Sequence, residues 1–129
     1  MTPQGTHPER EDRLPMWRRV LAGVALTGMF LRDIVASSLD VARIVLTPDR
    51  HNEPAIVAVP VDARTEWGVA LFAYLTSLTP GSTALHVSDD RRTLYVHYLD
   101  APDPAARGAV TKALYERWIV QMEGRRMTR

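Results

Sequence analysis

The chain has 129 residues, of which 46% are hydrophobic and 24% charged, and its formal net charge is +1. This length suits a single domain, and the small net charge argues against binding to nucleic acid through bulk electrostatic attraction. The chain contains no cysteine, which excludes a disulfide framework, a thiolate metal site and a cysteine nucleophile.

The first 15 residues are predicted to form a disordered leader. They combine prolines, a glycine and mixed charges without a periodic apolar pattern. A cleaved secretory signal fits poorly, because the apolar run begins only at Val20 and is interrupted by Arg32 and Asp33.

Residues 16–47 are predicted to form one long helix, because no proline occurs in this segment before Pro48 ends it. The continuous apolar run from Val20 to Leu31 is shorter than the roughly 20 residues needed to cross a bilayer. The whole segment is long enough to cross, but charged side chains then fall inside it.

Four of these charges share one side of the predicted helix: Arg32, Asp33, Asp40 and Arg43. At about 100° per residue they fall within an arc of roughly 100°, which leaves the rest of the helix surface mostly apolar. Such a helix packs on a soluble core, lies in the membrane interface, or enters the bilayer with its charges turned towards partner subunits. We favour membrane association, because the small domain that follows has too little surface to bury so wide an apolar side.

Residues 48–129 are predicted to form a small β-α-β-β-α domain. The run 54–60 is bounded by prolines and predicts a short strand. The segment 66–78 is apolar on nearly all sides and predicts a helix buried on several of them, with Asp62 or Thr65 as its N-cap.

A Thr-Pro-Gly-Ser segment at 79–82 stops this helix, because proline cannot extend it and glycine accepts a left-handed turn. The runs 83–87 and 94–99 then predict a β-hairpin. Their alternation predicts that Leu85 and Val87 face the core together with the apolar residues of the second strand.

The last predicted helix begins after Asp103, with Pro104 in its first turn. Apolar residues recur at every fourth position and predict its buried stripe: Val110, Leu114, Trp118 and Met122. The predicted fold class is therefore α+β, with an N-terminal amphipathic, membrane-associated helix followed by the β-α-β-β-α domain.

The sequence contains no arrangement that predicts catalysis or a cofactor. His86 and His97 share one face of the predicted hairpin beside Tyr95, but a metal site needs three or four ligands, so we interpret them as ordinary exposed histidines. The chain has no glycine-rich phosphate-binding loop and no nucleophile-elbow motif. We therefore expect neither an enzyme nor a metal or cofactor site.

Several short motifs follow one another in a characteristic order: Ser37-Ser38 in the first helix, Thr65-Glu66-Trp67, Leu78-Thr79-Pro80-Gly81-Ser82, Val87-Ser88-Asp89-Asp90, and Leu94-Tyr95-Val96-His97 followed by Asp100. Over about residues 17–116 they resemble the E-type subunit of the Mrp-type multisubunit monovalent cation/proton antiporters. The most specific motifs are the turn of Thr79, Pro80 and Gly81 and the strand with Tyr95 and His97. We expect these five residues to serve the fold.

The resemblance implies an accessory and assembly subunit of a plasma-membrane complex that exchanges Na⁺, or another monovalent cation, for H⁺. The implied partners are the other antiporter subunits and the lipid bilayer, with no nucleic acid, no cofactor and no small-molecule substrate of its own. The compact domain is expected on the cytoplasmic side, and Arg32, Asp33, Asp40 and Arg43 are expected to contact partner subunits. Because this family usually has two hydrophobic helices before the one that begins near Trp17, the resemblance predicts an N-terminally shortened subunit.

Two alternatives stay open at this point. The first is a soluble protein-interaction module whose long helix completes its own core. The second is a small nucleic-acid-binding protein, which would need basic residues beside stacking aromatic side chains on the hairpin face, where only Tyr95 is available.

Overall fold

The computed structural model describes residues 14–48 and 51–125. Within these residues the elements follow in the order α1 (Met16–Leu46), β1 (Ala55–Pro60), α2 (Glu66–Leu78), β2 (Ser82–Val87), β3 (Thr93–Tyr98) and α3 (Pro104–Met122). This order confirms the predicted α+β fold, a long N-terminal helix followed by a small β-α-β-β-α domain. Residues 1–13 of the predicted leader lie outside the described residues.

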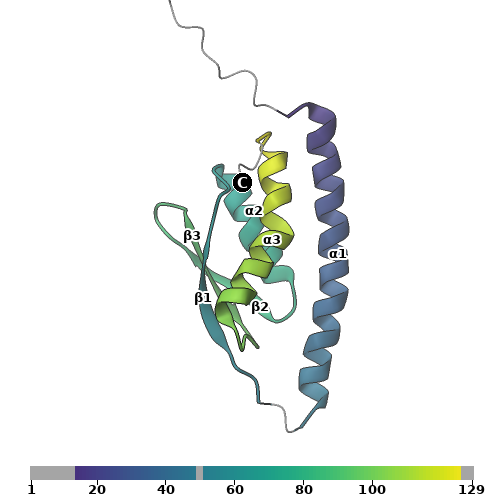
Figure 1. Ribbon diagram of the computed structural model, residues 1–129, viewed down its shortest axis with the longest axis vertical. Coiled ribbons are helices and arrows are strands. Elements are labelled where there is room, and N and C mark those ends of the chain that lie inside the picture. Colours follow the sequence, from purple (N-terminus) through teal and green to yellow (C-terminus); the bar gives the residue numbers. More distant parts are fainter. Residues whose placement is uncertain (1–13, 49–50, 126–129) are drawn as a thin grey trace, which may run out of the picture.

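The three strands form an antiparallel sheet in the order β1-β3-β2. Figure 1 shows a layered arrangement, in which α2 and α3 lie beside the sheet and α1 runs alongside α3, away from the strands. The core lies between the sheet and the two shorter helices, where Val59, Val96, Phe72 and Ile119 are almost completely buried.

Local sequence signals explain where the two shorter helices begin and where α2 ends. The Thr65 hydroxyl accepts a hydrogen bond from the Gly68 N–H at 3.1 Å, and the Asp103 carboxylate accepts one from the Ala106 N–H at 3.0 Å. Each bond satisfies an N–H group that has no partner within its helix. The chain then leaves α2 through Gly81, whose φ of 86° is a backbone conformation that glycine adopts without strain.

The predicted core face of the hairpin is correct at Val87, which pairs with Leu94, but wrong at Leu85. A β-bulge between Ala84 and His86 shifts the register of β2, so that Ala84 packs against the core. Leu85 is consequently 52% exposed. A bulge of this kind adds one residue to a strand and moves the following side chains to the opposite face.

The predicted stripe of α3 is also wrong in its position around the helix. Val110 is 51% exposed, and Leu114, Trp118 and Met122 are only partly buried. The buried side is instead formed by these residues: Gly108, Thr111, Tyr115, Glu116, Ile119 and Val120. Half of this set is polar, which is why a search for apolar periodicity missed it.

Helix α2 has the predicted bounds, but it is less enclosed than its composition indicated. Val69, Phe72 and Leu75 are buried, whereas Tyr74 is 68% and Leu78 62% exposed. One side of α2 therefore faces away from the core, and the expectation of burial on several sides is wrong for that side.

Candidate interface on the first helix

Among the described residues, α1 is the one helix whose length and composition suit a membrane span, although only 17% of its apolar stretch is buried within the protein. The core helix of a soluble protein can have a similar composition, but most of its apolar surface is then covered. Most of the apolar surface of α1 is therefore left uncovered by the described domain.

The side of α1 that points away from the domain carries large apolar side chains, which we call the outer stripe: Trp17, Leu21, Val24, Leu31, Val35, Leu39 and Leu46. Each of them is between 54% and 80% exposed. At about 100° per residue they fall within an arc of roughly 80° along the whole helix. An apolar stripe of this length on a single-chain structure marks a surface that something else covers.

The opposite side of α1, the inner side, packs on the domain through both small and large residues. Ala22, Leu26 and Ser37 are the buried residues of the helix. A Cβ atom added to Gly23 would lie 3.6 Å from the Met122 side chain, which shows how closely α1 and α3 approach here. Further along, the rings of Phe30 and Tyr115 meet edge to face, with centroids 6.3 Å apart.

Two hydrogen bonds fasten the N-terminal end of α1 to the C-terminal end of α3. The Arg19 Nε donates to the Met122 carbonyl at 2.8 Å, and the Leu14 N–H donates to the Gly124 carbonyl at 3.1 Å. The last carbonyl groups of a helix have no partner within it, so Arg19 satisfies a carbonyl at the end of α3 that would otherwise need water.

A polar cluster of Asp33, Tyr115 and Thr79 joins the middle of α1 to α3 and to the end of α2. The Tyr115 hydroxyl donates to Asp33 Oδ2, and Thr79 Oγ1 lies 3.3 Å from the same oxygen and 2.9 Å from Tyr115 Oη. Tyr115 and Thr79 are both buried. A carboxylate is a strong acceptor for hydroxyl donors, so Asp33 can accept hydrogen bonds from both hydroxyl groups.

The electrostatics of the cluster keep the tyrosine protonated. Burial raises the pKa of Tyr115, and its hydrogen bond to the Asp33 carboxylate raises this pKa further, while the hydrogen bond with Thr79 acts in the opposite direction. Tyr115 therefore remains a neutral hydroxyl donor to Asp33. Sequence reasoning singled out Asp33 and Thr79 separately, but it missed Tyr115 and did not bring the three together.

The remaining charges proposed for α1 lie on its exposed surface. Arg32 is exposed, and Asp40 and Arg43 form an ion pair of 2.9 Å between side chains that are 63% and 68% exposed. Pairs this exposed contribute little to stability. Arg18, Arg32 and Arg43 lie within an arc of about 40°, and we call them the arginine row.

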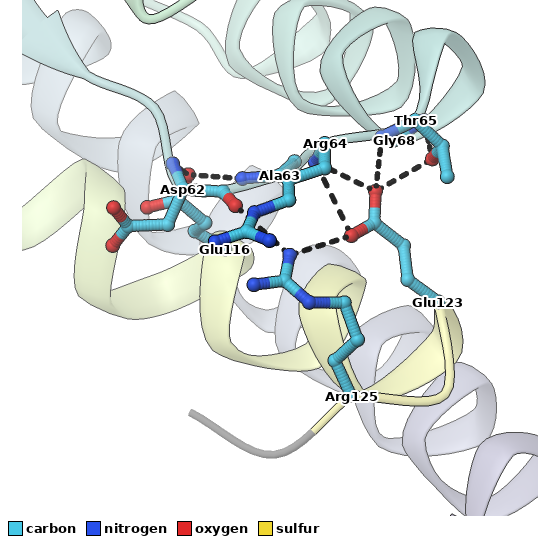
Figure 2. A network of polar contacts seen from close by, with 8 residues as sticks. All are labelled: Asp62, Ala63, Arg64, Thr65, Gly68, Glu116, Glu123 and Arg125. Atoms are coloured by element: carbon cyan, nitrogen blue, oxygen red, sulfur yellow. Dashed lines mark hydrogen bonds and ion pairs between the residues drawn. The ribbon is translucent and has the colours of Figure 1, made fainter. Parts of the chain in front are cut away.

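The acidic side chains of α3 are engaged with the backbone of the loop before α2. Figure 2 shows Glu123 reaching from the end of α3 to this loop, where its carboxylate accepts hydrogen bonds from the N–H groups of Arg64 at 3.2 Å and Thr65 at 3.0 Å. The Thr65 hydroxyl donates to the same carboxylate at 2.5 Å. Arg125 lies 3.6 Å from its other oxygen.

Glu116 is fully buried and binds the same loop from a position two turns earlier in α3. Its carboxylate accepts hydrogen bonds from the N–H groups of Asp62 and Ala63 and forms an ion pair of 2.9 Å with Lys112. Burial alone would lower the pKa of Lys112, but its hydrogen bonds to Asp62 and Glu116 raise that pKa above its ordinary value. These carboxylates stabilise the fold, and the described residues contain no group of three or more His, Asp or Glu placed to hold a metal ion.

The other residues singled out in the sequence lie in the turn after α2 and on the outer face of the sheet. Pro80 and Gly81 form the turn, and a Cβ atom on Gly81 would lie 3.3 Å from a methyl group of Val41 in α1. Tyr95 stacks on His86, with ring centroids 6.1 Å apart. His97 is half-buried in the same sheet face as Tyr95.

The sequence matches the family model for MNHE, Na⁺/H⁺ ion antiporter subunit, over residues 4–122. It is 35% identical over 105 residues to the E subunit of the Na⁺/H⁺ antiporter of Alkalihalophilus pseudofirmus, an alignment that covers 81% of this chain and 66% of that protein. It is 37% identical over 75 residues to the E1 subunit of the Na⁺/H⁺ antiporter of Staphylococcus haemolyticus, which covers 58% of this chain and 47% of that protein.

Two solved structures are also similar to this chain. A chain of the Mrp complex from a Dietzia species has 28% identity and a TM-score of 0.53, with 66% of this chain and 81% of that chain covered. A chain of the membrane-bound sulfane sulfur reductase, an archaeal respiratory membrane complex, has 28% identity and a TM-score of 0.67, with 90% of this chain and 66% of that chain covered.

The chain spans two thirds or less of the length of the curated relatives that it matches. The family match nevertheless covers α1, the sheet and both shorter helices. The packing of α1 on the β-α-β-β-α domain and the motif turn at Thr79 lie within the matched residues. This chain belongs to the Na⁺/H⁺ ion antiporter subunit family.

Proposed function

We propose that this protein is an accessory and assembly subunit of a multisubunit monovalent cation/proton antiporter of the cell membrane. The observation that carries the proposal is the family match over residues 4–122, which includes a helix that exposes a long apolar side. Membership of an antiporter subunit family, together with α1, associates the protein with a membrane. The exposed outer stripe favours this function over a soluble module, whose long helix would complete its own core.

We infer that the subunit supplies contacts to the complex and contributes neither an ion path nor a reaction of its own. The carboxylates of Glu116 and Glu123 are occupied by backbone N–H groups, and Asp33 accepts from Tyr115. An ion path needs ionisable groups along a route through the membrane. These three carboxylates are instead engaged in holding the elements of the chain together.

We propose that the exposed charges of α1 contact neighbouring subunits. Asp40 and Arg43 form an exposed ion pair that a neighbouring subunit can reach, whereas Arg32 is exposed beside the outer stripe. Asp33 is half-buried and bound to Tyr115, so its role in assembly is proposed to be indirect, through the placement of α1 on the domain. Asp33 and Asp40 should therefore be tested separately.

We further propose that the compact domain lies on the cytoplasmic side of the membrane. The absence of cysteine suits a reducing compartment, and it also supplies the test. A cysteine placed at the exposed Asp89 in the β2–β3 turn should react with a membrane-impermeant maleimide in inside-out vesicles and stay unlabelled in intact cells. Labelling in intact cells would contradict this orientation.

The assembly proposal is tested by co-purification with the large antiporter subunits of the same organism. Asp40→Ala combined with Arg43→Ala should lower recovery of this chain in the complex about tenfold, because a charged contact at an interface is worth enough free energy for such a change. The matched control is Asp89→Ala with Arg92→Ala, which removes the same two charges from the exposed β2–β3 turn.

The same preparations give the functional readout. Na⁺/H⁺ exchange by everted vesicles should fall in parallel with the recovery of the complex, whereas the control variant should match the wild type in both. Loss of exchange with an intact complex would argue against an assembly role. Failure of the wild-type chain to co-purify with any antiporter subunit would overturn the proposed function.

A further inference from the structure

The packing of α1 on the domain restricts how this helix meets a membrane. The contacts extend from Arg19, bound to the Met122 carbonyl, to Val41, which lies beside Gly81. At about 1.5 Å per residue this distance is roughly 33 Å, which is as long as the hydrocarbon layer of a bilayer is thick. If α1 crossed the bilayer in this state, the domain packed along it would enter the hydrocarbon as well.

The domain is unsuited to that environment. Its sheet is open, with β1 and β2 as edge strands, and hydrocarbon does not tolerate the unpaired backbone groups of an open sheet edge. Arg92 and Arg117 are also exposed on its surface, and an arginine in the hydrocarbon carries a large free-energy cost. The helix therefore keeps its domain outside the hydrocarbon and presents only its outer stripe to it.

The residues on the two sides of α1 indicate which side meets lipid and which meets protein. Helices that pack together within membranes approach through small residues. On α1 the small residues Ala22, Gly23 and Ser37 lie on the inner side, against the domain, while the outer stripe is interrupted by small residues at Gly28 and Ala42. The outer stripe has large aliphatic side chains and a tryptophan, which are typical of helices that lie in the membrane interface.

The charges beside the outer stripe have the sign that anionic lipid requires. The arginine row borders the stripe along the helix, and Asp40 is the one acidic residue of α1 that is exposed. Arg43 is held by Asp40, and the Arg18 guanidinium lies 5.2 Å from the centre of the Trp17 ring. Basic residues bordering an apolar helix face attract anionic headgroups, and tryptophan is enriched at the headgroup level.

We propose that α1 lies parallel to the plane of the membrane on a leaflet that contains anionic phospholipid. The outer stripe enters the boundary between headgroups and acyl chains, and Arg18 and Arg32 lie among the phosphate groups. The domain then sits on the far side of α1 from the lipid. The inference rests on the proposed function, because it describes how a subunit of a membrane complex meets the bilayer.

The orientation is tested with single-cysteine labels, which are unambiguous because the natural chain has no cysteine. A fluorescent label is placed at Leu21, Leu31 or Leu46 of the full chain reconstituted into vesicles, and its depth is measured by quenching with lipids brominated at different carbons. A helix lying flat gives the three labels the same shallow depth. A helix that crosses the bilayer gives a deep Leu31 label between two shallow ones. The control label at Asp89 should stay in water and should not be quenched by the brominated lipids.

The occupant of the stripe is tested by sedimentation with vesicles of phosphatidylcholine alone or in an equal mixture with phosphatidylglycerol. Val24→Asp with Val35→Asp should weaken binding to both vesicles about tenfold or more, because a carboxylate is strongly disfavoured at the acyl boundary. Val110→Asp introduces the same carboxylate at an exposed valine of α3 and should bind like the wild type.

The arginine row is tested on the same vesicles. Arg18→Glu with Arg32→Glu should remove most of the preference for phosphatidylglycerol and leave binding to phosphatidylcholine nearly unchanged. The matched pair Arg92→Glu with Arg117→Glu makes the same charge change on the domain and should keep the preference. Circular dichroism and thermal unfolding confirm that each variant is folded before its binding is compared.

The possible results separate this inference from the proposed function. Equal shallow depths, loss of binding by the stripe variant and loss of lipid preference by the arginine variant support it. A deep Leu31 label overturns it and leaves the assembly proposal standing. Normal vesicle binding by the stripe variant, with loss of co-purification with the antiporter subunits, also overturns it and identifies a protein as the occupant of the stripe.

Discussion

The two sides of α1 both carry apolar side chains, but only one side is covered by the protein's own domain. On the inner side, small residues and the polar cluster of Asp33, Tyr115 and Thr79 are covered by the domain. On the outer side, large apolar side chains, Trp17 and Leu31 among them, are exposed. In a helix that only completes its own core, the apolar stripe faces inward. In α1 a second apolar stripe faces outward and is left uncovered by the domain.

The largest expected difference in unfolding free energy between the two sides of α1 comes from truncating one leucine on each side. Leu26→Ala, on the inner side, should lower the free energy of unfolding by about 3 kcal/mol, because Leu26 is buried against α3 and the core. Leu31→Ala, on the outer side, should change it by less than about 0.5 kcal/mol. Urea denaturation in mild detergent measures both, and equal losses would contradict the distinction between the two sides.

The two aspartates of α1 give a second matched pair. Asp33→Ala should cost about 2 kcal/mol of unfolding free energy, because it leaves the buried Tyr115 hydroxyl without its charged acceptor. Asp40→Ala should cost less than about 0.5 kcal/mol, because its ion pair with Arg43 is exposed. The same denaturation experiment compares them, with Asp33→Asn as a control that restores some of the hydrogen bonding.

The smallest expected effect concerns alkaline pH. Tyrosines in the unfolded chain ionise near pH 10, whereas burial raises the pKa of Tyr115 and of Tyr98 in the folded protein. The unfolded state therefore loses protons first, so stability is complete below about pH 10 and falls as the pH rises above it.

Each tyrosine contributes up to about 1.4 kcal/mol per pH unit to this loss. Tyr115→Phe should make the decline of unfolding free energy between pH 10 and pH 11 shallower by up to that amount, as measured by urea denaturation at both pH values. A variant that declines as steeply as the wild type would show that Tyr115 keeps no raised pKa.

The sequence predicted the elements of the domain well because local chemistry determines their ends. Thr65 and Asp103 cap their helices through hydrogen bonds within one turn, and Gly81 supplies the left-handed turn after α2. Signals of this kind act over a few residues and can be read without knowing the tertiary structure. The exposed apolar side of α1 was predictable for a different reason: the domain that follows is too small to cover it.

Contacts between distant segments of the chain were not predictable in this way. Tyr115 lies 82 positions from Asp33, and nothing in either local sequence links them. The buried side of α3 includes Tyr115 and Glu116, which an apolar pattern passes over, and the bulge beside Leu85 changes a register that alternation alone assumes to be regular. In each case, whether the side chain is buried depends on which distant segment packs against it. The available signal was that Tyr115 lies at helical spacing from Thr111 and Ile119, which are also buried in α3.

The three fastenings of α1 have a mechanical consequence. The helix is held near Arg19 by the end of α3, at Asp33 by Tyr115, and at Val41 by the close approach of Gly81. Because these points are spread along its length, the helix cannot roll about its own axis without breaking all of them at once. A change in the position of α1 would therefore be passed first to α3, which packs against both α1 and β1.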